Sequence, residues 1–356
     1  MPAPRLAEIL STHTPALFAA AVGRAVELLR AGEVVALPTE TVYGLAAHAL
    51  DAQAVARIYE VKGRPAHNPI IVHVASLELA RRCARAWPAT AEALARSFWP
   101  GPLTLVLPRA ATIPDAVTAG GDTVGIRWPS HPFIQAVIRG CGFPLAAPSA
   151  NPANRVSPTN AAHVQKWLGE KIPLVVDGGQ SQVGIESTVV DLVSSPPRLL
   201  RPGMISEMAL NAALAAVGVA LATRDAANSG ASETARTGVA GPLRSPGQLE
   251  LHYAPRARLI VREWADEANL ARQLREFSAD PARITIVAHT RVPMSGGYGR
   301  VSVIPHDAEA FARAIYGELH HADEAGAELI VIEALPETPE WTGIADRLRR
   351  AAAPRK

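Results

Sequence analysis

The sequence predicts an α/β protein with two units, a larger one over residues 8–217 and a smaller one over residues 257–353. In both units, short apolar runs rich in β-branched residues alternate with segments of helical periodicity. Residues 218–256 join the units. Within them, residues 223–248 are rich in Ala, Gly, Ser and Thr and have no apolar period, which predicts a linker.

The first elements follow from apolar spacing. Residues 16–31 predict a helix, because their apolar residues fall on one stripe and Gly32 is placed to end it. The apolar run 33–37 predicts a strand. A second helix is expected next, from apolar residues at three- and four-residue spacing: Val55, Ile58, Tyr59 and Val61. The run 69–74 then predicts a second strand.

Pro88 interrupts the periodicity of residues 77–97, so two helices broken at that proline are expected. The segment that starts at Trp99 reads as a turn into a buried strand that ends at Leu107. The remaining elements of the larger unit are predicted in this order: strand 123–127, helix 131–140, strand 145–147, helix 159–168, strand 174–176, a pair of strands at 187–192 and 198–201, and helix 206–216.

The smaller unit shows continuous apolar runs typical of buried parallel strands. Helical segments alternate with these runs, which predicts a small doubly wound, Rossmann-like domain. The strands are expected at 258–262, 284–288, 301–304 and 329–333, and the helices at about 265–278, 307–324 and 343–352.

Composition limits the class of protein. A hydrophobic content of 48% and a net charge of +2 are typical of a globular protein and do not favour wholesale nucleic-acid binding. The cysteines are Cys83 and Cys141, without a CxxC pair, which excludes a four-cysteine zinc site and predicts two core residues. The N-terminus lacks the apolar core of a signal peptide, and no run approaches the ~20 apolar residues of a membrane helix, so we expect a cytoplasmic enzyme.

Lys62 and Arg64 flank a glycine before an apolar run. Such a turn lets the backbone approach an anion, with lysine as a point charge and arginine as a fork that grips phosphate. The chain has four lysines against 31 arginines, so a lysine here hints at a lysine-specific task. A solvated basic turn is the alternative that these residues alone leave open.

Several standard mechanisms are excluded by missing motifs. The dipeptide Gly-Lys of a Walker A loop does not occur, nor does HExxH or GxSxG. What remains is a set of small polar and basic residues near predicted strand ends, where open α/β sheets place ligands. Their chemistry suits positioning more than acid–base catalysis. The set comprises Thr39, Lys62, Arg64, His73, Thr123, Arg127, Ser149, Asn151, Ser157, Ser187 and Arg201.

Each of these residues also has a purely structural interpretation. Thr39 could end a strand, and His73 could be a core histidine with its hydrogen bonds satisfied. The serines and Asn151 could be turn formers or ordinary strand residues. Arg127 and Arg201 could extend to solvent from apolar surroundings.

The sequence blocks decide between the two interpretations. They are PTETVYGL (38–45), KGRPxxNPIIVHV (62–74), VGIRWPSHP (124–132), APSAN (147–151), GIESTVVD (184–191), LLRPG (199–203) and SPGQLELHYAP (245–255). In this order the chain resembles the long form of the YrdC-like family. The resemblance implies a YrdC-like mixed, twisted sheet, followed by a linker that folds over the active site and a C-terminal α/β domain.

The resemblance also implies a reaction, L-threonylcarbamoyladenylate synthesis. Threonine, bicarbonate and ATP give threonylcarbamoyl-AMP and pyrophosphate, the first step of tRNA N6-threonylcarbamoyladenosine formation. Mg²⁺ would be held mainly through phosphates and water, without a protein metal site. The labile product would pass to a separate tRNA threonylcarbamoyl transferase, and direct tRNA binding by this chain is not required.

Carried onto this sequence, the family's site assigns Lys62 and Arg64 as catalytic residues that also bind the phosphates of ATP. The other residues expected to face ATP are Thr123, Ser149, Asn151, Ser157, Arg201 and, from the linker, Tyr253. The residues expected to line the L-threonine pocket are Thr39, His73, Arg127, Ala147 and Ser187.

Two departures and two alternatives stand beside this interpretation. Residues 248–251 replace the middle of the family's linker motif, including its basic residues, and His67 stands where an acid is common. A double-stranded-RNA-binding or ribosome-maturation factor is the main alternative, which the near-neutral charge does not favour. A carbamoyltransferase of hydrogenase maturation would carry zinc-binding cysteine pairs, which this sequence lacks.

Overall fold

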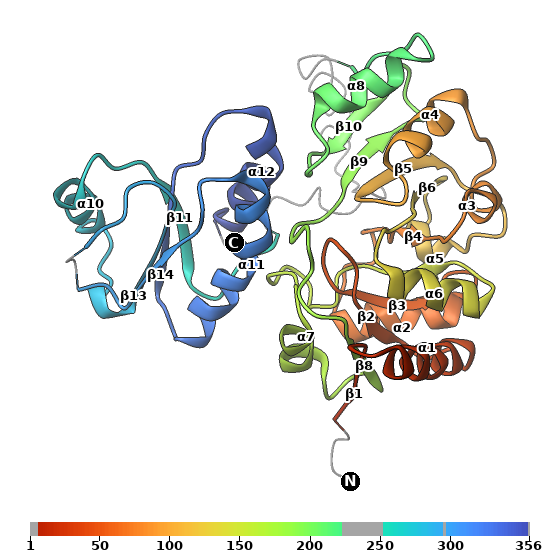
Figure 1. Ribbon diagram of the computed structural model, residues 1–356, viewed down its shortest axis with the longest axis horizontal. Helices are drawn as coiled ribbons and strands as arrows, with labels where there is room; N and C mark the ends of the chain where they lie inside the picture. The colour runs from red at the N-terminus through yellow and green to blue at the C-terminus, as the bar shows by residue number, and fades with distance from the viewer. Residues whose placement is uncertain (1–5, 223–251, 295–296, 355–356) are drawn as a thin grey trace.

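The computed structural model describes residues 6–222, 252–294 and 297–354. Two α/β units lie side by side in Figure 1, the larger N-terminal and the smaller C-terminal. The predicted linker residues 223–248 lie outside the described residues, and so do residues 249–251. None of the helices in the described part of the chain combines the length and apolar character needed to cross a membrane.

A ten-stranded mixed sheet forms the centre of the larger unit. Strands β2 and β7 both pair antiparallel with β3, and β4 pairs antiparallel with β7, so the loops after β2 and β7 lie beside the segment that leads into β4. Across the sheet the strands are β1 (Glu8–Ser11), β8 (Leu174–Asp177), β2 (Val35–Leu37), β3 (Gly44–His48), β7 (Leu145–Ala146), β4 (Val72–His73), β6 (Thr123–Arg127), β5 (Leu103–Pro108), β9 (Thr188–Asp191) and β10 (Arg198–Arg201).

Helices cover both faces of this sheet. They are α1 (Pro15–Arg30), α2 (Ala52–Lys62), α3 (Leu77–Cys83), α4 (Ala89–Phe98), α5 (Asp115–Thr118), α6 (Pro132–Cys141), α7 (Ala161–Leu168) and α8 (Glu207–Ala215). Alternation along β2 shows how the faces divide: Val35 and Leu37 pack with α1 and α6, whereas Ala36 packs into the core on the other face. Cys83 and Cys141 are both buried thiols, as predicted.

The smaller unit is a four-stranded parallel sheet in the order β11 (Arg258–Arg262), β14 (Leu329–Glu333), β12 (Ile284–Ala288) and β13 (Arg300–Val303). Helix α10 (Glu267–Leu274) covers one face, and helices α11 (Ala308–Glu324) and α12 (Thr342–Ala351) cover the other. Two short 3-10 helices, Pro281–Arg283 and Pro339–Trp341, complete it. The doubly wound prediction is confirmed.

The sequence-based elements agree with the structure wherever periodicity was strong, including the helix break at Pro88 and the antiparallel pair of β9 with β10. Two strands and one α-helix were not predicted, β1, β3 and α5, and neither were the two 3-10 helices. The strand predicted over 69–74 is shorter, because only Val72 and His73 pair with β6 and β7. The backbone of Ile70 instead donates to the carbonyl of Val117.

Candidate active site

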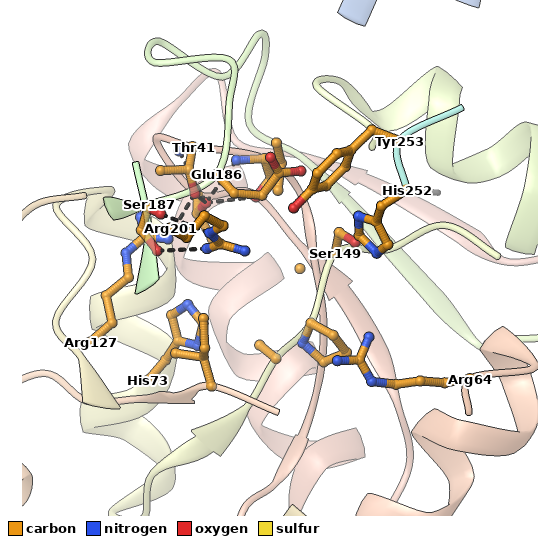
Figure 2. Close-up of a pocket in the computed structure, with 16 residues that line it drawn as sticks. Thr41, Arg64, His73, Arg127, Ser149, Glu186, Ser187, Arg201, His252 and Tyr253 are labelled. Carbon is orange, nitrogen blue, oxygen red and sulfur yellow. Dashed lines mark hydrogen bonds between the residues drawn. The ribbon is translucent and has the colours of Figure 1, made fainter. Parts of the chain in front are cut away.

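A pocket opens where the loops after β2 and β7 meet strands β4, β6 and β10, the segment before β9 and the chain that returns from the linker (Figure 2). The unfilled space in this region is about 540 Å³, part of it open to solvent. The lining residues are Thr39, Thr41, Val42, Gly44, Arg64, Ile71, His73, Arg127, Ala147, Pro148, Ser149, Glu186, Ser187, Arg201, His252 and Tyr253.

The charged and aromatic side chains of the pocket fall into two groups in Figure 2. Arg127 and His73 lie on one side, Arg64 and His252 lie on the other, and Arg201 lies between them. All five residues predicted for threonine, and four of the eight predicted for ATP, are in the lining. Cations therefore lie on both sides of the pocket and between them, which suits a ligand with more than one anionic group.

Arg127, at the end of β6, is held by three partners. Its Nε donates to the carbonyl of Gly101 at 3.3 Å, and its Nη1 donates to Thr41 Oγ1 at 2.8 Å. Its Nη2 forms an ion pair with Glu40 Oε1 at 2.6 Å. Although burial raises the pKa of Glu40, the Arg127 charge lowers it overall. Each terminal nitrogen of Arg127 keeps one further N–H that can donate to a carboxylate.

His73 is 3% exposed and lies beside Arg127. Burial, with the Arg127 charge second, lowers the pKa of His73 to about 3. The imidazole is therefore neutral at physiological pH. Its Nδ1 is buried and has no hydrogen-bond partner in the structure. A neutral ring with one unpartnered nitrogen can form a neutral hydrogen bond with a ligand. The alternative interpretation of His73, a core histidine with all its hydrogen bonds satisfied, does not fit this nitrogen.

Thr39 and Thr41, in the loop after β2, line the pocket, and their hydroxyls hydrogen-bond to each other at 2.9 Å. Thr39 Oγ1 donates to the carbonyl of Val42 at 2.6 Å and accepts from the backbone N–H groups of Thr41 and Val42. Such side-chain-to-backbone bonds fix a tight loop. The structural interpretation of Thr39 is thus supported, although the residue also lines the pocket.

Ser187 and Arg201 meet in the centre of the pocket. Arg201 donates from Nε to the Ser187 carbonyl at 3.0 Å and from Nη2 to Ser187 Oγ at 3.1 Å. Ser187 Oγ also shares a hydrogen bond of 2.8 Å with Thr104 Oγ1. The guanidinium of Arg201 is therefore fixed on the strand pair β9–β10 and does not extend to solvent.

Arg64 begins the loop after α2, next to Gly63, which ends the helix in the left-handed conformation. Its side chain donates to the carbonyls of Asn68 and Pro69 and to Asn68 Oδ1 at 2.6–3.0 Å. Burial lowers the pKa of Arg64 to about 10, so the side chain stays cationic at neutral pH. It provides a fixed cation on the side of the pocket opposite Arg127.

Lys62 is buried outside the pocket lining. Its Nζ donates to the backbone carbonyls of Ser149 and Asn151, and its own carbonyl accepts from the N–H of Ala153. Burial, with the Arg64 charge second, holds the pKa of Lys62 well below its ordinary value. Lys62 therefore organises the loop after β7, whose Ser149 lines the pocket. Its predicted phosphate contact stays a prediction.

Three other residues predicted for ATP lie outside the lining. Thr123 begins β6, at the end opposite Arg127. Asn151 is buried and donates from Nδ2 to the carbonyls of Pro152 and Arg155. Ser157 is buried and donates to Glu186 Oε1 at 2.6 Å. A nucleotide contact for each of them stays a prediction.

Sequence reasoning missed Glu186 and His252, which both line the pocket. Burial, followed by the charges of Arg64, Arg201, Lys62 and Arg347, holds the pKa of His252 well below its ordinary value, which makes it a neutral ring among cations. Tyr253 next to it has a φ of +62°, and the N–H of Ala254 donates to the carbonyl of Asn154. The end of the linker is thereby fixed over the pocket. Both missed residues stand inside the quoted blocks GIESTVVD and HYAP.

Within the lining, Glu186 is the one carboxylate, against the three arginines Arg64, Arg127 and Arg201. No group of three or more His, Cys, Asp or Glu side chains suited to a metal occurs among the described residues. The arrangement favours an anionic ligand held by fixed arginines and neutral hydrogen-bond groups.

Comparison of the whole chain with known proteins identifies two matching families and several relatives. Residues 27–203 match the Sua5_yciO_yrdC family, described as "Telomere recombination", and residues 205–353 match Sua5_C, described as "Threonylcarbamoyl-AMP synthase, C-terminal domain". The chain is 38% identical to the threonylcarbamoyl-AMP synthase of Pyrococcus abyssi over 330 residues, which are 91% of this chain and 92% of that one. It is also 38% identical to the Bacillus subtilis protein of that name, over 97% and 95% of the two chains.

The solved structure of P. abyssi Sua5 complexed with L-threonine superposes with a TM-score of 0.82 at 35% identity, covering 97% of each chain. Shorter relatives also match. A putative threonylcarbamoyl-AMP synthase of Mycobacterium tuberculosis is 37% identical over 182 residues, which are 51% of this chain and 83% of that one.

Proposed function

This chain belongs to the Sua5_yciO_yrdC family, in the form that carries the Sua5 C-terminal domain, and on this premise we propose that it synthesises threonylcarbamoyl-AMP. In the proposed reaction the amine of L-threonine attacks the carbon of bicarbonate, and loss of water leaves a carbamate. A carbamate oxygen then attacks the α-phosphorus of ATP, and pyrophosphate leaves. The observation that carries the proposal is one pocket with a fixed arginine near each end and a third between them.

In this proposal the Arg127 side of the pocket binds threonine. The two remaining N–H groups of Arg127 grip the carboxylate, and Glu40 and Thr41 hold the guanidinium in place. His73, kept neutral by burial, offers its unpartnered Nδ1 to a polar group of threonine. Ser187 and the backbone around Ala147 complete this end. These groups position threonine so that its amine, in the deprotonated form, faces the bicarbonate carbon.

The Arg64 side binds the nucleotide. Arg64 and Arg201 face the phosphates, and Tyr253 covers the nucleotide from the linker. Lys62 keeps the loop of Ser149 in place through the carbonyls of residues 149 and 151. Fixed cations near the leaving pyrophosphate stabilise the charge that develops there.

Mg²⁺ enters this proposal as an ion held by phosphates and water. The carboxylate that lines the pocket, Glu186, is already bonded to Ser157, Tyr316 and Arg347 and is not available as a simple metal ligand. The product is a mixed anhydride that hydrolyses readily. A transferase that carries the threonylcarbamoyl group to a tRNA adenosine is the class of reaction that would consume it.

The test follows pyrophosphate release from ATP and Mg²⁺ with threonine and bicarbonate each present or omitted. We expect release only when both are present. Arg127→Lys should raise the KM for threonine and leave the KM for ATP nearly unchanged, and Arg64→Met should do the reverse. Release that ignores threonine, or an unchanged KM for each substrate in both variants, would contradict the proposal.

A further inference from the structure

Glu186 connects the pocket to the C-terminal unit. Its Oε1 accepts from Ser157 Oγ at 2.6 Å in the larger unit. Its Oε2 accepts from two side chains of the smaller unit, Tyr316 Oη of α11 at 3.0 Å and Arg347 Nε of α12 at 2.7 Å. Although burial raises the pKa of Glu186, the charges of Arg347 and Arg201 lower it overall. The pocket therefore contains a carboxylate that is ionised at neutral pH and whose partner comes from the other unit.

Arg347 is fully buried and contacts three segments of the site at once. Its Nη2 donates to the backbone carbonyl of Glu186 at 2.9 Å, and its Nη1 donates to the carbonyl of Pro202, next to Arg201, at 2.8 Å. Its guanidinium also lies 5.4 Å from the centre of the Tyr253 ring. These contacts place one cation of α12 behind Glu186, Arg201 and Tyr253.

Backbone packing fixes this position. A Cβ on Gly184, two residues before Glu186, would collide with the backbone of Ala312 and Arg313 in α11. A Cβ on Gly343, at the start of α12, would lie 2.7 Å from the carbonyl oxygen of Gly203. The two segments that carry Glu186 and Arg201 thus rest directly on the helices of the smaller unit, with little freedom to shift.

We propose that Arg347 is a positioning residue of the nucleotide site, which neutralises Glu186 so that the pocket keeps a net positive charge toward the triphosphate. Neutralisation of Glu186 is needed because the triphosphate of ATP is itself negatively charged. A free carboxylate in a partly desolvated pocket repels the phosphates, whereas a carboxylate paired to an arginine behind it does not. The C-terminal unit thereby contributes a residue on which ATP binding depends, an inference that rests on the proposed function.

The test measures equilibrium binding of ATP by calorimetry to the full-length protein and to four variants: Arg347→Met, Arg347→Lys, Glu186→Gln and the double variant. We expect Arg347→Met to weaken ATP binding roughly tenfold or more, because Glu186 is left uncompensated. Glu186→Gln should bind ATP at least as tightly as the wild type. The double variant should return close to Glu186→Gln, and Arg347→Lys should fall between the wild type and Arg347→Met.

Arg283→Met is the matched control, because Arg283 pairs with Glu328 on the surface of the same unit and should leave ATP binding unchanged. Equal ATP binding by the wild type and Arg347→Met would overturn the inference. So would a double variant as weak as Arg347→Met, since Arg347 would then act only as a scaffold between the units. If Arg347→Met does not fold, weaker ATP binding by Glu186→Gln overturns the inference on its own. A wild-type protein that does not bind ATP would instead overturn the proposed function, and the inference with it.

Discussion

Arg127 and Glu40 form an ion pair of 2.6 Å in which both side chains are almost completely buried. The pair lies at the end of the pocket that we propose for threonine, and it sets the direction of the Arg127 guanidinium. Glu40 also accepts from the N–H of Ser130 at 3.0 Å, which ties the loop after β2 to the loop after β6. Two segments of the site are thereby held together by one carboxylate.

The first prediction concerns this pair. Glu40→Gln keeps the shape of the side chain but leaves Arg127 as an uncompensated buried charge, which costs about 3–5 kcal/mol of unfolding free energy. We expect a lower urea midpoint and a raised KM for threonine. Glu33→Gln is the control, because Glu33 pairs with Arg57 at the surface and should change stability by less than about 1 kcal/mol. Equal losses in the two variants would refute the role given to the buried pair.

The second prediction concerns Lys62. Lys62→Met removes the donor to the Ser149 and Asn151 carbonyls. Among the described residues, only the Ser149 carbonyl keeps a second donor, the N–H of Asn151. The loop after β7 should shift, and a displacement of about 1 Å is enough to lower pyrophosphate release roughly 100-fold. Lys166→Met, which removes an exposed pair with Glu324, should retain activity. Full activity in Lys62→Met would show that the loop holds its position without the lysine.

The third prediction is a loss of stability in acid. His163 of α7 and His320 of α11 stack at 3.8 Å across the two units, and burial lowers their pKa values to about 3 and about 4. Between pH 6.5 and the folded pKa, the unfolded chain binds a proton that the folded protein does not. Unfolding free energy therefore falls as the pH drops, by about 2 kcal/mol at pH 5 relative to pH 7.5 for His320 alone.

Urea unfolding at the two pH values measures this effect. His320→Gln keeps a donor for the Ser157 carbonyl, which His320 Nε2 contacts at 3.1 Å, and should remove the share of the pH dependence that His320 contributes. His13→Gln, at an exposed position, is the matched control. If His320→Gln keeps the full pH dependence, the acid sensitivity has another source.

The fourth prediction separates backbone strain from packing between the units. Gly184 and Gly218 both have positive φ, +82° and +70°, but only at Gly184 would a Cβ meet another backbone, that of α11. Gly184→Ala should therefore destabilise the protein by about 1–3 kcal/mol more than Gly218→Ala, since overpacking is added to the strain. Limited proteolysis should show faster cleavage between the units in Gly184→Ala alone. Similar behaviour of the two variants would mean that α11 moves aside at little cost.

The extent of sequence-based prediction differs between the elements. Helices with strong apolar spacing, such as α1 and α11, were predicted to within a residue or two, because local spacing and capping determine them. Strand β3, GLAAH, was missed because small residues without β-branching give no local strand signal. That strand exists because β2 and β7 pair with it on either side.

For the site, the sequence blocks identified nine lining residues, and the structure added Glu186 and His252 to the charged and aromatic ones. The sequence by itself determined most of the strands and helices in their order, the two-unit organisation and the family, but not β1, β3 and α5. Only the tertiary structure decided that Lys62 faces backbone carbonyls. Only the tertiary structure decided, too, that Glu186 pairs with Arg347, which lies 161 positions further along the chain. The physical reason is distance along the chain. Periodicity and caps act over a few residues, whereas the partner of a buried charge is chosen by how the completed sheets and helices pack.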